Sequence, residues 1–512
     1  METTRWLRWP LLLLAAVLSV AAPVRSQATR PRLIVLLVVD QMRADYVDRL
    51  SGQWTSGFRR LLTNGAWFRH IDYPYFDTLT CPSHATLSSG TLPSTHGMVL
   101  NVWWDPRKKR EVRCTQDDAA TFVSYGRPVP GTADSAANLR VPTLADELRE
   151  RSGSPGRVIA LSLKARSAIG LGGHKPDVVT WFDDSGTWVT STAFSKGPVP
   201  PVADFIRQHP VEGPDYDAWQ TSPRSDEYLA QMAMDVATRM RFDAATTTNM
   251  IGIGFSALDR VGHAFGPDSS EVEETLAHLD RTLGVLLDGL DGLVGEGNYT
   301  VALTADHGVA PVPEQISARG ADAGRVTPAR FTEQIEGVFR SVLGRGRYVA
   351  HVVSTHVYLN PGVVGRVKKS NRLDAVRARI RALPFVADVY WQDDIRAADP
   401  HGDTTLSAIA RSNDPQRSGD LTIVLRPNWI AYAGATTHGT AYDYDTRVPL
   451  LLMGAGIRPG QYLQPASPLD IAPTLAFLAG VTLPHAEGRV LREALFVTSA
   501  APYVSRAFTT GR

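Results

Sequence analysis

The chain has 512 residues, enough for about three domains of ordinary size or for one large α/β enzyme. Hydrophobic residues make up 43% of it and charged residues 21%, as in a globular protein that buries a full core. Because 53 Lys and Arg residues balance 52 Asp and Glu residues, no global field attracts nucleic acid or an anionic membrane surface. An anionic substrate must therefore be bound by local charges.

Residues 1–26 have the layout of a secretory signal peptide. Arg5 and Arg8 form a charged region, residues 11–20 are an apolar run, and small residues up to Ser26 offer a cleavage site. The alternative is a single membrane anchor, but the run is short for a bilayer span and no stop-transfer pattern follows it. We expect cleavage, export to the bacterial periplasm or medium, and no membrane attachment afterwards.

Five near-continuous aliphatic runs predict strands that are buried on both faces, as in a parallel sheet covered by helices. They are residues 33–39, 157–162, 250–255, 299–304 and 448–453. Helical apolar spacing lies between or after them, at residues 141–148, 228–240, 272–290 and 469–478. This alternation predicts an α/β fold with a doubly wound, largely parallel central sheet flanked by helices.

The stretch 311–428 departs from the alternation. It is richer in charge and contains its own predicted helix at 373–383 and short strands at 385–391 and 421–425. We interpret it as an insertion or cap subdomain. It interrupts a catalytic domain that spans 27–512, with a core at about 31–310 and 429–495.

The two cysteines, Cys81 and Cys114, leave two alternatives open. In an exported chain they could form a disulfide, worth roughly 3–4 kcal/mol in the chain-entropy model. They could equally be two buried free thiols, because the sequence does not measure their separation.

Acidic and imidazole side chains gather where predicted strands end. Six of them lie at strand ends or in adjacent loops: Asp40, Asp259, His263, Asp306, His307 and His438. In an open α/β sheet such groups converge outside the carboxyl ends of the strands, and mixed imidazole and carboxylate ligands suit zinc. Each cluster alone is typical of a helix cap or a polar contact. Together they supply enough ligands for two metal ions with open positions.

Residues 76–90 are rich in small and hydroxyl side chains and include Thr80. A threonine hydroxyl is a poor nucleophile at neutral pH unless a metal or a base generates the alkoxide. The structural alternative is a helix cap followed by a loop. We expect Thr80 to cap a helix N-terminus, where the helix dipole and free N–H groups favour an anion.

The motifs taken together resemble the alkaline phosphatase superfamily, in its phosphodiesterase and nucleotide-pyrophosphatase branch. The resemblance runs from Asp40 to about Leu478. It rests on five ordered motifs: Val-Val-Asp40-Gln-Met-Arg, Thr80-x-Pro-Ser-His, Asp-x-x-Gly-His263, Ala-Asp306-His307-Gly and Thr-His438-Gly.

The resemblance implies two Zn²⁺ ions and a phospho-Thr80 intermediate. One zinc would be held by Asp259, His263 and His438. The other would be held by the remaining ligands and the nucleophile: Asp40, Asp306, His307 and the Thr80 oxygen. The expected substrates are small-molecule phosphate esters, and the expected oligomeric state is a monomer.

Two basic residues favour phosphate monoesters as substrates, because a monoester dianion needs more positive donors than a diester. Lys164 and Arg166 follow a predicted strand two residues apart, so in extended chain their side chains point the same way. The alternative is a pair of solvated surface charges. The pair and Asn101 resemble phosphoryl-contacting residues of phosphate-irrepressible bacterial alkaline phosphatases with a threonine nucleophile. We predict a monoester hydrolase, with a phosphodiesterase as the alternative.

Three rival functions fit less well. A sulfatase needs a Cys-x-Pro-x-Arg stretch, but Cys81 is followed directly by Pro82 and Ala85 stands in place of the Arg. A phosphoethanolamine-type transferase carries several membrane spans, and the sequence shows none beyond the predicted signal peptide. An inactive metal- or phosphate-binding protein would have lost a ligand or the nucleophile, and all seven positions are intact.

Overall fold

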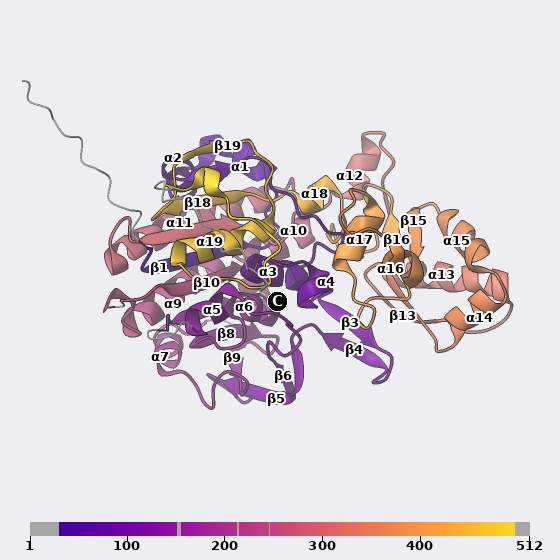
Figure 1. Ribbon diagram of the computed structural model, residues 1–512, viewed down its shortest axis with the longest axis horizontal. Helices are drawn as coiled ribbons and strands as arrows, with labels where there is room; N and C mark the ends of the chain where they lie inside the picture. Colours follow the sequence, from indigo (N-terminus) through magenta and orange to yellow (C-terminus); the bar gives the residue numbers. More distant parts are fainter. Residues whose placement is uncertain (1–29, 151–154, 212–214, 245, 497–512) are drawn as a thin grey trace, which may run out of the picture.

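The computed structural model describes residues 30–150, 155–211, 215–244 and 246–496 (Figure 1), so the predicted signal peptide lies outside the described residues. An eleven-stranded sheet forms its centre. In spatial order the strands are β19 (Gly460–Tyr462), β2 (Ala66–Phe68), β18 (Leu450–Gly454), β11 (Tyr299–Thr304), β1 (Leu33–Val39), β10 (Asn249–Phe255), β7 (Val158–Ser162), β8 (Val178–Asp183), β9 (Thr187–Ser191), β5 (Gln116–Ser124) and β6 (Thr132–Asp134).

The middle of this sheet is parallel. β1 lies between β10 and β11, with Leu33 opposite both Asn249 and Tyr299, and β7 and β8 continue the parallel order. All seven residues of β1 are buried, as its unbroken aliphatic sequence predicts. The strand predicted at 448–453 corresponds to β18, which runs antiparallel to β11. The predicted fold class is confirmed.

Two groups of helices pack against the sheet (Figure 1). One group consists of α3 (Thr80–Ser89), α5 (Leu144–Glu150), α6 (Ala165–Gly172) and α19 (Ile471–Ala479). The other consists of α2 (Gly57–Asn64), α9 (Arg224–Arg239) and α11 (Ser270–Val294). Further helices connect the elements: α1 (Asp45–Arg49), α4 (Pro93–His96), α7 (Pro200–Gln208), α8 (Tyr216–Thr221), α10 (Ala257–Phe265) and α18 (Asp443–Thr446). Every residue of α3 is buried, so this helix lies inside the molecule.

The 311–428 segment forms a second sheet with its own hydrophobic cluster, drawn in orange to one side of the central sheet in Figure 1. Its antiparallel strands are, in order, β13 (Val349–Val353), β14 (His356–Leu359), β16 (Leu421–Leu425) and β15 (Val386–Trp391). Its helices are α12 (Pro313–Ala318), α13 (Pro328–Leu343), α14 (Val363–Lys369), α15 (Leu373–Arg381), α16 (Gln392–Ala397) and α17 (Thr405–Ser412).

Two small ribbons complete the fold. The hairpin of β3 (Val102–Asp105) and β4 (Arg110–Arg113) follows α4, and β12 (Gly324–Arg325) pairs with β17 (Trp429–Ile430). Within the described ranges, we find no helix with the length and apolar composition that a bilayer crossing requires.

Candidate metal centre

Four adjacent parallel strands, β11, β1, β10 and β7, bring their carboxyl ends to one edge of the central sheet. Asp40 directly follows β1, and Asp306 lies two residues after β11. Asp259 lies on α10, just after β10, and Lys164 is the cap residue of α6, just after β7. This edge therefore collects the acidic groups that the sequence places at strand ends.

Asp259, His263 and His438 form the first cluster. Their candidate ligand atoms all lie within 4.8 Å of one another. Asp259 and His263 are one turn apart on α10, with His263 Nε2 3.2 Å from Asp259 Oδ1. His438 Nε2 lies 3.8 Å from the same oxygen.

Asp40, His84 and Asp306 form the second cluster, again within 4.8 Å. All three side chains are fully buried, and His84 Nε2 lies 3.5 Å from Asp40 Oδ1. His307 adjoins this cluster, with Nε2 3.1 Å from Asp306 Oδ2. Its ring stacks on His438 at a centroid distance of 3.4 Å, so the two clusters are contiguous.

The four imidazoles share one orientation, because each Nδ1 faces a backbone carbonyl at 2.8–2.9 Å. The pairs are His84 with Thr80, His263 with Thr436, His307 with Gly308, and His438 with Thr78. A carbonyl only accepts, so each Nδ1 donates. In the neutral ring the lone pair is then on Nε2, the atom that faces the carboxylates, which is how ligating histidines are held.

Several buried atoms of the second cluster have no hydrogen-bond partner among the described residues. They are Asp40 Oδ1, His84 Nε2, Asp306 Oδ2 and His307 Nε2. An unpaired buried polar group costs roughly 1–3 kcal/mol, and a bound cation would satisfy several of these atoms at once. The residues present therefore fit a metal ion.

Local electrostatics also favour metal binding. Burial and the neighbouring Asp306 carboxylate raise the pKa of Asp40, because two buried carboxylates repel each other. Burial alone would raise the pKa of Asp259, but the Lys164 ammonium and the His263 imidazole hold it well below its ordinary value. Burial and the adjacent His307 lower the pKa of His438 well below its usual value. These shifts favour the ionised form of Asp259 and the neutral form of His438, which bind metals, whereas Asp306 raises the pKa of His307 above its ordinary value despite burial.

Lys164 lies between the two clusters. Its Nζ is 2.7 Å from Asp40 Oδ2 and 2.6 Å from Asp259 Oδ2. Arg166 is the second residue of α6, so the argument that the two side chains align through extended chain is wrong. The cause is that the helix begins at Ala165, directly after Lys164. Both side chains nevertheless line one cavity of about 720 Å³.

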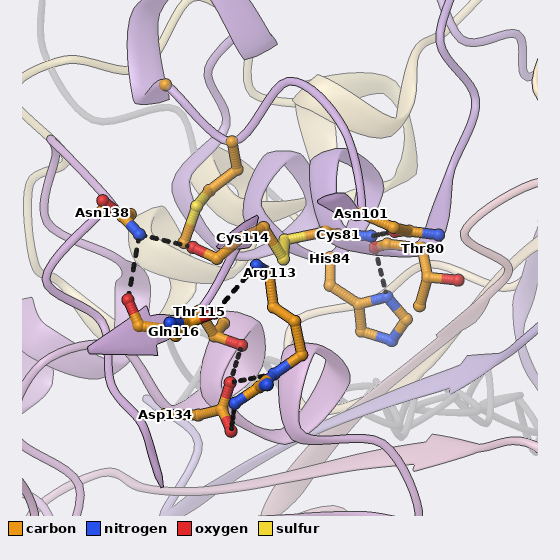
Figure 2. The surroundings of a disulfide bond; sticks show 12 residues. Thr80, Cys81, His84, Asn101, Arg113, Cys114, Thr115, Gln116, Asp134 and Asn138 are labelled. Carbon is orange, nitrogen blue, oxygen red and sulfur yellow. Dashed lines mark hydrogen bonds and ion pairs between the residues drawn. A yellow bond between two sulfur atoms is a disulfide. The ribbon is translucent and has the colours of Figure 1, made fainter. Parts of the chain in front are cut away.

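Asn101 lies against the N-terminus of α3. Its Oδ1 accepts a hydrogen bond from the Cys81 N–H at 2.8 Å (Figure 2). It lines a different cavity from Lys164 and Arg166, one of about 360 Å³ that also reaches His263. The structure therefore places Asn101 beside the first residues of α3 but not in the cavity of the basic pair.

Thr80 is the first residue of α3 and is buried. The cap position is Leu79, without a side-chain capping hydrogen bond, so the expectation that Thr80 itself caps the helix is wrong. A hydroxyl one residue inside the helix is not committed to the turn's own N–H groups. Cys81 and Cys114 form a disulfide (Figure 2), which decides between the two alternatives left open by the sequence.

Two residues of the site were not assigned from the sequence, although both lie inside the motifs: Gln41 and His84. Gln41 has a left-handed backbone, with φ 69°, an uncommon conformation for this residue type. Its backbone N–H donates to Asp306 Oδ1 at 3.0 Å and its Nε2 donates to Asp259 Oδ1 at 2.8 Å. It therefore bridges the two clusters, and the strained backbone is what aims both donors.

A doubly wound sheet with two candidate metal-ligand clusters at its carboxyl edge is an arrangement that suits metal-dependent hydrolysis. A family model described as type I phosphodiesterase / nucleotide pyrophosphatase matches residues 34–447. The alkaline phosphatase PafA of Elizabethkingia meningoseptica is 30% identical over 546 residues, which cover 94% of this chain and 98% of that protein. The alkaline phosphatase PhoV of Synechococcus elongatus is 27% identical and covers 91% of this chain and 93% of that protein.

Solved structures agree. A crystal structure of PafA matches with a TM-score of 0.83 at 29% identity, covering 92% of this chain and 100% of that chain. Murine ectonucleotide pyrophosphatase/phosphodiesterase 5 shares the fold, with a TM-score of 0.56 at 16% identity. The chain belongs to the type I phosphodiesterase / nucleotide pyrophosphatase family. The predicted place in the alkaline phosphatase superfamily and the predicted enzyme class, a phosphatase, are confirmed.

Proposed function

We propose that this phosphatase hydrolyses phosphate monoesters with two zinc ions and Thr80 as the nucleophile, through a phospho-threonine intermediate. The observation that carries the proposal is the convergence of two buried carboxylate and imidazole clusters on the edge of the sheet where α3 begins. The relatives named alkaline phosphatase support it.

Zinc is the metal that this donor set suits, because each cluster mixes imidazole nitrogen with carboxylate oxygen. One ion would be held by Asp259, His263 and His438. The other would be held by the remaining predicted ligands: Asp40, Asp306, His307 and the Thr80 oxygen. When bound, the pair supplies positive charge that ionises the Thr80 hydroxyl and neutralises the leaving oxygen.

The chain's own groups at α3 position the phosphoryl group. Thr80 Oγ would form the new bond to phosphorus while the ester bond to the leaving alcohol breaks, and water would later cleave the phospho-threonine. The positive end of the α3 dipole, where Thr80 lies, favours an anion. Because the Cys81 N–H holds Asn101 by its Oδ1, the Asn101 NH₂ group is left to donate to a phosphoryl oxygen.

Lys164 and Arg166 are the basis for preferring monoesters. Lys164 has three donors, two of which contact Asp40 and Asp259, and Arg166 lines the same cavity. A dianionic phosphoryl group gains more from these charges than a monoanionic diester does. A phosphodiesterase on the same fold is the second candidate, because the family model carries that description.

The 311–428 segment is proposed to act as a cap that shapes the leaving-group side. The cavity of about 360 Å³ is lined by Asn101 and His438 from the core and by Ser354 and Thr355 from the segment. Thr355 Oγ1 is buried without a hydrogen-bond partner among the described residues, so it is available to a polar leaving group. Export through residues 1–26, a periplasmic or secreted location and a monomeric state complete the proposal.

Two measurements test the function. The first is the ratio of kcat/KM for an aryl phosphate monoester to that for its matched diester, with zinc counted; a higher value for the diester would remove the monoester proposal. The second is Thr80→Ala, expected to keep zinc and lose turnover. Unchanged turnover would exclude Thr80 as the nucleophile.

The basic pair has its own test. Lys164→Ala and Arg166→Ala are expected to lower monoesterase activity far more than diesterase activity, because the second negative charge loses its donors. Equal losses for both substrates would mean that the pair serves structure instead.

A further inference from the structure

The four residues before α3, Phe76 to Leu79, are held by the 311–428 segment; we call them the pre-helix turn. The Phe76 side chain is 1% exposed and packs in a hydrophobic cluster that this segment otherwise forms: Ile395, Ala408, Ile409 and Val424. Ser412 Oγ, at the end of α17, accepts hydrogen bonds from the N–H groups of Phe76 and Asp77 at 2.9 and 3.0 Å.

A buried histidine of the same segment contacts the turn. His356, the first residue of β14, places Nε2 3.0 Å from Asp77 Oδ1, and both side chains are buried. The Gly419 N–H faces His356 Nδ1 at 3.4 Å. Because a backbone N–H only donates, Nδ1 accepts, and Nε2 carries the proton and donates to the Asp77 carboxylate. Such a charge-assisted bond between two buried side chains is strong and directional.

The pre-helix turn leads to two groups of the proposed site. The Thr78 carbonyl accepts the hydrogen bond from His438 Nδ1 at 2.9 Å and so sets the direction of His438 Nε2. Leu79 is the cap residue of α3, directly before Thr80. Two tight backbone bonds, from Thr78 N to Phe76 O at 3.0 Å and from Leu79 N to Asp77 O at 2.9 Å, stiffen the turn. A displaced Asp77 would therefore displace both groups.

We propose that His356 and Ser412 are positioning residues, which hold Thr80 and His438 in place through Asp77 and the pre-helix turn. The inference rests on the proposed function, in which Thr80 is the nucleophile and His438 a metal ligand. Neither positioning residue is assigned a contact with substrate. The 311–428 segment then contributes to the rate and not only to the shape of the pocket.

The test compares three substitutions in the full-length, zinc-loaded protein with an aryl phosphate. His356→Leu removes the donor to Asp77, and His356→Gln places an amide donor near the position of Nε2. The matched control is His351→Leu. His351 also joins the 311–428 segment to the core, through Glu111 at 2.6 Å and the stacked Trp104 ring, but on the β3–β4 hairpin.

His356→Leu is expected to lower kcat about 10- to 100-fold, as lost outer-shell partners do, with a much smaller change in KM. Its zinc affinity, titrated against a chelator, should fall about 10-fold. His356→Gln should recover most of the turnover, and His351→Leu should leave kcat unchanged. A lower melting temperature with unchanged kcat and zinc affinity for His356→Leu would overturn the proposal. So would an equal loss of kcat in His351→Leu, or no recovery in His356→Gln.

Ser412→Ala keeps the test decisive if His356→Leu does not fold, because it removes only the oxygen that accepts from the turn. It should lower kcat in the same direction by a smaller factor, and an unchanged kcat would overturn the proposal. Thr80→Ala separates a failure of the proposed function from a failure of the positioning role. Full activity of Thr80→Ala refutes the proposed function, whereas an inactive Thr80→Ala beside a fully active His356→Leu refutes the positioning role alone.

Discussion

The two large sheets of this molecule place polar side chains in opposite ways. The central sheet is parallel in its middle, and its strand ends deliver Asp40, Asp306 and Asp259 to one edge. The sheet of the 311–428 segment is antiparallel, and none of its described residues belongs to either candidate metal cluster. It contributes instead His356, whose bond goes to the pre-helix turn.

The difference follows from strand direction. Parallel strands end together, so groups that follow them meet without any further device. Antiparallel strands end alternately at opposite edges, and such a sheet offers a packed face more readily than a focus of ligands. The central sheet therefore carries the candidate metal ligands, whereas the 311–428 segment contacts the turn from which α3 starts.

The largest expected effect tests this division with two matched substitutions. Asp306→Asn keeps an acceptor for the Gln41 N–H, bonded at 3.0 Å, but removes the charge. Charge stabilisation by a metal is worth several kcal/mol, so kcat should fall by about 10³-fold or more, with loss of zinc from the second cluster. Asp420→Asn, whose carboxylate accepts from the Leu359 N–H in the second sheet at 2.7 Å, should leave kcat unchanged.

Steady-state kinetics with zinc counting by elemental analysis gives the answer. Two bound zinc ions and full turnover in Asp306→Asn would contradict the assignment of chemistry to the central sheet. An equally large loss in Asp420→Asn would show that the second sheet does more than hold the turn.

Much of the fold could be predicted because runs and spacings of apolar residues indicate which segments are buried. The aliphatic runs predicted β1 and β11 to the residue, and the short strand predicted at 421–425 coincides with β16. Strand direction could not be predicted, since periodicity reports which faces are buried and not which neighbour a strand pairs with. The antiparallel direction of β18 is therefore known only from the structure. The polar strand β5, which lies between β9 and β6, was missed because only some of its residues are buried.

The site divides in the same way. Asp40 and Asp306 could be predicted to lie close together, because each follows a buried strand of the central sheet. The bridging role of Gln41 could not be predicted, because it depends on a left-handed backbone that the sequence does not indicate. The bond between Asp77 and His356 joins residues 279 positions apart, and no local pattern marks either partner.

The second prediction compares the stability of the two sheets through the disulfide. This bond links Cys81, in α3, to Cys114, which directly follows β4. Replacing Cys81 and Cys114 by serine should lower the free energy of unfolding by about 3–4 kcal/mol, the chain-entropy value for a loop of this length. The loss should be confined to the core. Hydrogen exchange should therefore quicken in α3 and β4, while the amides of β14 and β16 stay protected.

Reducing agent provides the control, since it should destabilise the natural protein and leave the double serine variant unaffected. Equal loss of protection in both sheets would mean that the two unfold as one unit. Unchanged stability on reduction would mean that the bond closes a loop that the core already fixes.

The smallest expected effect is a pH dependence of the stability of the core. The Asp146 carboxylate, bonded to His174 Nδ1 at 2.8 Å, raises the pKa of His174 above its ordinary value. Burial alone would raise the pKa of Asp146, but the His174 hydrogen bond holds it below its ordinary value. The histidine's contribution is complete below its unfolded pKa of about 6.5 and is lost as pH rises through the folded pKa. The carboxylate's contribution is complete above about pH 3.9 and is lost as pH falls through its lowered pKa.

The pair is therefore strongest between about pH 4 and pH 6.5. Because it is partly exposed, His174→Gln should cost only roughly 0–1 kcal/mol. Thermal unfolding should show a larger decrease in melting temperature at pH 5.5 than at pH 8.5, with the transition of the core affected and that of the second sheet unchanged. An equal decrease at both pH values would show that His174 stabilises the core through packing, with no contribution from its charge.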